Sequence, residues 1–103
     1  MTRTDYDADE MRVLALVLDD GRRFDDLERR GGRNLFASKH ARTVFDAVVQ
    51  CRDRHGRVIR EVVYGILRQD VGPAEAQILM DQLISEAVYG EWDDSLVLLQ
   101  ERA

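Results

Sequence analysis

The residue types that most often carry catalysis or bind metal ions are few in this chain, and their spacing keeps them apart. The single cysteine, Cys51, and the first histidine, His40, lie in one segment of helical periodicity. At a rise of 1.5 Å per residue their backbones would stand about 16 Å apart, too far for a nucleophile and its base. His55 is farther from His40 still, so the two histidines cannot share a metal ion within one chain. One thiol supplies too few ligands for structural zinc, and we expect Cys51 to be buried and inert.

The acids near the start of the chain alternate like the first ligands of a calcium-binding loop. Asp5, Asp7 and Asp9 have that alternation. Such a loop also needs a glycine at its sixth position for the sharp turn and a bidentate glutamate at its twelfth. These positions hold Glu10 and Leu16, so the pattern excludes a calcium loop.

The remaining features with possible chemistry are neighbouring acids and one glycine pair. Gly31 and Gly32 lack the lysine and hydroxyl that a phosphate-binding loop requires. The paired acids fall at expected helix ends, where solvated carboxylates are ordinary. They are Asp19 with Asp20, Asp25 with Asp26, and Asp93 with Asp94. We therefore expect no enzymatic activity, no cofactor and no metal ion.

Length and composition indicate one soluble domain. The chain has 103 residues, of which 45% are hydrophobic and 34% charged, and a domain of this size buries enough apolar surface for one core. No apolar stretch approaches the roughly 20 residues of a membrane helix, and no secretion signal is recognisable at the start. We expect a cytoplasmic protein that is a single domain over residues 1–103, with its core in residues 7–88 and a tail over residues 91–103.

The formal net charge of −5 is distributed unevenly. Residues 1–21 carry −4, residues 22–60 carry +6 and residues 61–103 carry −7. A basic middle segment leaves open a small nucleic-acid-binding regulator, although binding driven by counterion release needs the cations on one face. The arginines that would have to converge are Arg29, Arg30, Arg33, Arg42, Arg52, Arg54, Arg57 and Arg60.

Hydrophobic periodicity and capping signals predict an all-α fold, a compact bundle of five to six helices. Asp7 and Glu10 have capping-box spacing, so the first helix is expected to begin there and to end near Gly21, buried on more than one side. A short helix around residues 24–27 follows. Leu35 and Phe36 are expected to plug the core from a polar connector.

The second half of the chain repeats the same kinds of signal. Ser38 caps a third helix that Gly56 closes, and Pro73 opens a fifth that ends near residues 89–90. Between them, residues 58–67 have a helical stripe, although their β-branched side chains leave a strand possible. In the tail, four consecutive apolar residues, 96–99, point around most of a helix. Part of that run is a candidate contact surface, the alternatives being a tail folded back on the core or a strand.

Three segments taken together resemble a known family. They are Glu-Met-Arg-Val-Leu-Ala-Leu-Val-Leu-Asp from Glu10, a connector ending in Leu35 and Phe36, and Ala-Arg-Thr-Val-Phe-Asp-Ala ending at Ala47. The spacing from Phe36 to Phe45 belongs to the same pattern. Over residues 9–88 the chain resembles the small helical N-terminal domain of DnaB-type replicative helicases. That domain is similar in fold to the C-terminal helicase-binding domain of DnaG-type primases.

The resemblance implies a docking module of DNA replication, which binds a replicative helicase or primase or forms a homodimer. It also implies that the contact surface lies on the fifth helix and the tail, since such domains associate through a C-terminal pair of helices. Aromatic side chains in that region would serve as anchors. The expected interface residues are Met80, Ile84, Val88, Tyr89, Trp92, Leu96 and Leu99. An unrelated helical adaptor remains the other protein-binding alternative.

Overall fold

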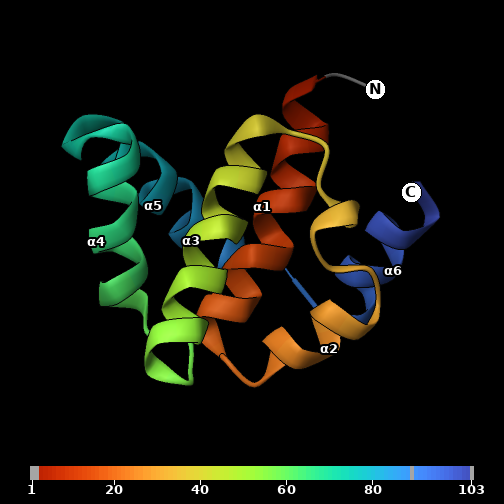
Figure 1. Cartoon of the computed structure of the whole chain (residues 1–103). Coiled ribbons are helices and arrows are strands. Elements are labelled where there is room, and N and C mark those ends of the chain that lie inside the picture. The colour runs from red at the N-terminus through yellow and green to blue at the C-terminus, as the bar shows by residue number, and fades with distance from the viewer. Residues whose placement is uncertain (1–2, 89, 103) are drawn as a thin grey trace.

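Helix α1 (Arg3–Asp19) runs through the middle of the molecule, and most of the other helices pack around it (Figure 1). The computed structural model describes residues 3–88 and 90–102. Helix α1 contacts α2, α3, α5 and α6, whereas α4 lies at the outside against α3 and α5. The whole measures 32 × 29 × 23 Å. The helices are α1 (Arg3–Asp19), α2 (Arg23–Arg29), the 3₁₀ turn η1 (Gly32–Leu35), α3 (Lys39–His55), α4 (Arg60–Val71), α5 (Pro73–Ala87) and α6 (Trp92–Arg102).

The predicted all-α bundle is confirmed, and α1 is its centre because it is buried nearly all round. Each residue from Val13 to Val17 is buried, as the broad apolar stripe of this segment predicts. The predicted start of the helix is wrong: α1 begins at Arg3, so Asp7 lies inside it. No glycine or proline interrupts residues 3–19, so the helix begins before the capping motif and runs through it.

Glu10, the second residue of that motif, does not cap α1 but holds the connector before α3. Its side chain is fully buried, and Oε1 accepts hydrogen bonds from the backbone N–H groups of Ala37 and Ser38, both at 3.0 Å. The other oxygen, Oε2, is buried without a hydrogen-bond partner in the described part of the chain. The connector is thereby fixed where Phe36 enters the core, with its ring centroid 5.4 Å from that of Phe45.

Local signals place α3 and α5 where the sequence predicts them. Ser38 accepts a hydrogen bond from the N–H of Ala41 at 3.1 Å, and Gly56 ends α3 in the left-handed conformation with φ of 73°. Pro73 occupies the first turn of α5, where its missing N–H has no partner to lose. Residues 60–71 form helix α4, so the strand alternative is wrong for this segment.

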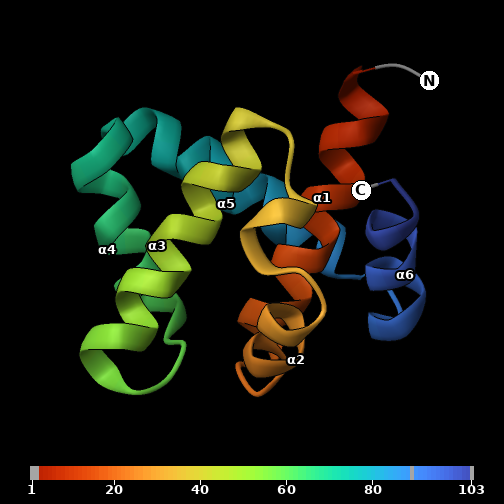
Figure 2. The same cartoon turned by 45° about the vertical axis from the view of Figure 1, so that its right-hand side comes forward.

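The core extends beyond residue 88, contrary to the expected boundary. Leu96 and Leu99 of α6 are buried in the same cluster as α1 and α3. Helix α6 lies against α1 and against η1 (Figure 2). The tail is therefore an integral helix of the bundle. In the described residues, no helix combines the length and the hydropathy needed to cross a membrane.

Candidate protein-interaction surface

The outward side of α5 carries two large apolar side chains that the bundle leaves uncovered. Ile84 is 57% exposed and Val88, one turn later, is 77% exposed. Ile84 borders a shallow hollow together with Leu18 at the end of α1 and Arg60 at the start of α4. Met80 lines the bottom of this hollow and is only 6% exposed, so it contributes packing rather than contact area. We call Leu18, Arg60, Ile84, Ala87 and Val88 the α5 patch.

The expected surface on the tail needs correction. Leu96 and Leu99 are at most 1% exposed, and Trp92 packs partly buried against the core. The alternative of a tail folded back on the core therefore describes these three residues, because α1 and η1 supply an apolar seat that one helix face can fill. Tyr89 lies outside the described residues. Of the seven expected interface residues, Ile84 and Val88 lie fully at the surface.

A cluster of hydrogen bonds, which we call the Asp26 clamp, fastens α6 to α2. Trp92 Nε1 donates to Asp26 Oδ2 at 2.8 Å, and Arg30 donates to the same oxygen at 3.3 Å. Arg30 also donates to Asp93 at 3.1 Å and to Gln100 Oε1 at 3.1 Å. The Trp92 hydrogen bond, followed by that of Arg30, lowers the pKa of Asp26 below its ordinary value. The clamp fixes which face of α6 looks outward.

The outward face of α6 holds four residues outside the seven expected interface residues, although Val97 and Leu98 belong to the run 96–99 that is a candidate contact surface. Asp94, Val97, Leu98 and Glu101 follow one another at helical spacing and are all exposed, Val97 to 40% and Leu98 to 36%. We call them the α6 face. The sequence shows the i, i+3, i+4, i+7 spacing of these residues, but it equally shows a stripe that includes Leu96 and Leu99. Only the packing of α6 decides which of these two stripes is buried.

The arginines of the middle segment do not form a free basic face. Arg54, Arg57 and Arg60 are exposed, and they make no ion pair within residues 3–88 and 90–102. They lie at the end of α3 and the start of α4. The other five are bonded within the chain: Arg29 to Asp26 at 3.1 Å, Arg30 to Asp26 and Asp93, Arg33 to Asp46 at 3.1 Å, Arg42 to the carbonyl of Phe36 at 2.7 Å, and Arg52 to Asp25 at 2.9 Å.

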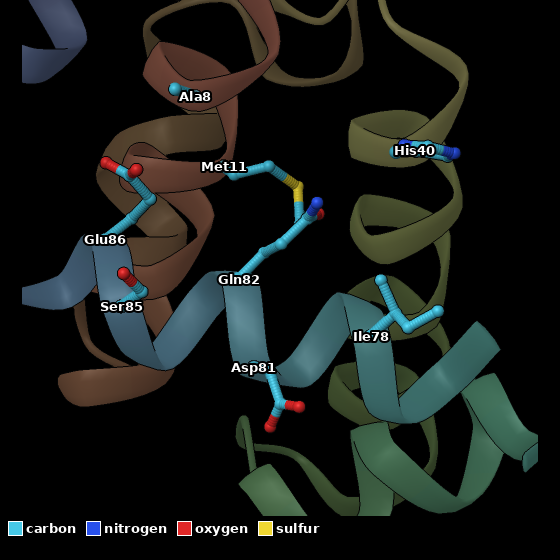
Figure 3. A pocket seen from close by; sticks show the side chains of 8 residues that line it. All are labelled: Ala8, Met11, His40, Ile78, Asp81, Gln82, Ser85 and Glu86. Atoms are coloured by element: carbon cyan, nitrogen blue, oxygen red, sulfur yellow. The ribbon is translucent and has the colours of Figure 1, made fainter. Parts of the chain in front are cut away.

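A groove of about 550 Å³ opens between the N-terminal parts of α1 and α3, with α5 as its floor (Figure 3). Figure 3 shows Gln82 extending up from α5 between the two walls, with His40 on the α3 wall and Ser85 beside Glu86 toward α1. Glu86 accepts from Arg12 at 2.9 Å, and His40 lies 3.6 Å from Glu75. Glu86, toward α1, and His40, on α3, are thus each held in a pair of their own at opposite sides of the groove.

Cys51 is buried, as predicted, and its sulfur is engaged with the loop that follows α3. The N–H of Ile59 donates to Sγ at 3.2 Å, and the carbonyl of Arg57 lies 3.4 Å from it. Among the residues that the structure describes, no three His, Cys, Asp or Glu side chains are grouped to hold a metal ion. The exposed apolar residues of α5 and α6 are thus the surface features that packing leaves unexplained.

Comparison with protein-family models, with curated proteins and with solved structures gives no match in any of the three. The surface of the molecule and its sequence pattern are therefore what indicate a function.

Proposed function

We propose that this chain is a non-enzymatic protein-interaction domain of the cytoplasmic DNA replication machinery, which docks to a replicative helicase or a primase. The observation that carries the proposal is the α5 patch, where Ile84 and Val88 stand one helical turn apart and more than half exposed. Apolar side chains at this spacing are what a partner helix covers in helix-in-groove recognition. The assignment to replication depends on the family pattern of the Glu10 helix and the Phe36 to Phe45 segment.

The structure supports an association through α5 better than one through the buried side of the tail. Exposed aliphatic residues gain by being removed from water, at roughly 25 cal/mol per Å² of apolar area. Leu96 and Leu99 are already removed from water within the chain, so a partner cannot stabilise a complex by burying them. A partner that reached them would first have to detach α6 and break the Asp26 clamp. We therefore place the docking surface on the α5 patch.

The test is a direct binding measurement with purified DnaB-type helicase and DnaG-type primase from the source cell. Isothermal titration calorimetry should detect binding of at least one of them. Ile84→Asp should weaken it by roughly 30-fold or more, the effect of losing a central anchor of about 2 kcal/mol. Ile78→Asp is the matched control, since Ile78 is also on α5 and 52% exposed but borders the groove instead.

Two outcomes would contradict the proposal. Failure of both proteins to bind would remove the replication role. Equal weakening by Ile84→Asp and Ile78→Asp would show that the α5 patch is not the docking surface.

The alternative of a nucleic-acid-binding regulator has weaker support. Five of its eight arginines are bonded within the chain, and only Arg54, Arg57 and Arg60 are left to meet phosphates. Three phosphate contacts would give a log–log salt dependence of about −2.7 on duplex DNA. Fluorescence anisotropy with labelled single- and double-stranded DNA at low and moderate salt measures that slope. A slope near this value would favour the alternative.

A further inference from the structure

The molecule carries two exposed helical surfaces whose apolar parts are alike and whose charges are opposite. The α6 face has Val97 and Leu98 at its centre and one acid a helical turn away on each side, Asp94 and Glu101. All four side chains are exposed. This stripe is therefore an acidic amphipathic surface on a helix that is already docked by its other side.

The α5 patch has the complementary composition. Ile84 and Val88 form its apolar centre, with Leu18 and Ala87 half-buried beside them. Its charged member is Arg60, which is exposed and makes no ion pair in the described part of the chain. Arg57, three residues earlier in the loop before α4, is exposed and likewise has no ion pair there. A partner with carboxylates on either side of apolar side chains fits this surface.

Within one molecule the α6 face lies away from Arg60. Figure 2 shows α6 on one side of the bundle and α4, which carries Arg60 at its start, on the other. Pairing of two α6 faces would place acids against acids, and pairing of two α5 patches would place Arg60 near its own copy. Like charges opposed across an interface are costly, so symmetric pairing through either surface is disfavoured.

We propose that the occupant of the α5 patch is a second copy of this chain, which presents its α6 face. Val97 and Leu98 of one copy cover Ile84 and Val88 of the next, and Arg60 meets a carboxylate of Asp94 or Glu101. In such a pair one copy still has its α5 patch free and the other its α6 face, so the contact is head-to-tail and generates open chains rather than closed dimers. This inference goes beyond the proposed function and rests on its placement of the docking surface, and it makes a second copy and the helicase or primase alternative occupants of the same patch.

The test uses two variants that each lose one surface. The first carries Ile84→Asp and Val88→Asp, and the second carries Val97→Asp and Leu98→Asp. These positions are exposed, so both variants are expected to fold, which circular dichroism and thermal melting verify. By analytical ultracentrifugation the wild-type chain should give a mass that rises continuously with concentration and falls with added salt. Each variant alone should be monomeric.

Mixing the two variants gives the decisive result. The first retains an intact α6 face and the second an intact α5 patch, so the mixture should form a 1:1 heterodimer and nothing larger. Arg60→Glu alone should weaken wild-type association on the order of tenfold, and its mixture with an Asp94→Arg, Glu101→Arg variant should recover it. Ile78→Asp is the control, and it should associate like the wild type.

Three results would overturn the inference: a wild-type chain that is monomeric at every concentration, variants that still associate singly, or a mixture that stays monomeric. These failures are distinct from failure of the proposed function. A monomeric chain that binds helicase or primase through Ile84 retains the proposed function without self-association. A chain that self-associates as described but binds neither protein retains the inference and loses the replication role.

Discussion

Replacement of Glu10 by leucine should destabilise the fold far more than loss of a surface acid. The substitution keeps a side chain of similar size in a fully buried site but removes the acceptor of the N–H groups of Ala37 and Ser38. A hydrogen bond to a charged group contributes about 1.5–3 kcal/mol, so two are worth roughly 3–6 kcal/mol. Relief from burying Oε2 without a partner offsets about 1–3 kcal/mol of that loss.

The net expected loss for Glu10→Leu is therefore about 2–3 kcal/mol in the free energy of unfolding. For a domain of this size that corresponds to a fall in Tm of roughly 10–25 °C. Glu10→Gln should cost less, about 1 kcal/mol, because the amide oxygen still accepts from both N–H groups while the charge is lost. Urea denaturation followed by circular dichroism gives both values. The exposed Glu28 provides the control, since Glu28→Gln should change stability by less than about 0.5 kcal/mol.

Hydrogen exchange separates this account from a general packing effect. Ala37 and Ser38 lie in the connector before α3, so protection of their amides depends on the Glu10 carboxylate. NMR should show both amides protected in the wild type and both exchanging fast in a Glu10→Leu variant that is still folded. Unchanged protection of these amides, or a Glu10→Leu variant as stable as the wild type, would refute the reasoning.

Three further predictions concern the Asp26 clamp, the tail and one glycine. Because the folded-state pKa of Asp26 lies below the ordinary 3.8, the clamp is fully present above that value and is lost as pH falls through the lower folded-state pKa. The emission of Trp92, the only tryptophan, should report this acid transition, which Asp26→Asn should remove. Leu96→Ala should cost about 2–5 kcal/mol and Leu98→Ala less than about 1 kcal/mol in urea denaturation, because only Leu96 is fully buried. Gly56→Ala should lower stability by about 1–2 kcal/mol in thermal melting, because a residue with a side chain is strained at the φ of 73° found here. The new methyl group meets no neighbouring atom, so this backbone strain is the whole expected cost.

The parts of the fold that the sequence predicted correctly depend on signals within a few residues of each other. Ser38 caps the amide of Ala41 three residues on, and Gly56 and Pro73 act through their own backbone dihedral angles. Such devices work whatever the rest of the chain does. The bounds of α3 and the start of α5 were therefore accessible without coordinates.

The features that the sequence missed depend on contacts between distant segments. Glu10 satisfied a capping pattern locally, yet its carboxylate is 27 residues away in sequence from Ala37, whose N–H it accepts. No local pattern predicts that use. The arginines behaved similarly: Arg30 reaches Asp93, and Arg52 reaches Asp25, so the basic character of residues 22–60 is reduced by partners that only the fold brings near. The net charge of a segment therefore overstates the number of its arginines that are unpaired at the surface.

Helical geometry alone predicts that part of the apolar run 96–99 is exposed. Successive residues turn by about 100° around a helix, so four consecutive apolar residues cannot all face one core. Whichever face docks, two of them must point outward. The Asp26 clamp and the seat on α1 bury Leu96 and Leu99, and this choice exposes Val97 and Leu98 beside Asp94 and Glu101. The sequence therefore predicts that two of the four residues are exposed, and the docking of α6 determines which two. Apolar side chains at positions that cannot be buried contribute little to the stability of one chain, whereas covering them by association removes their area from water.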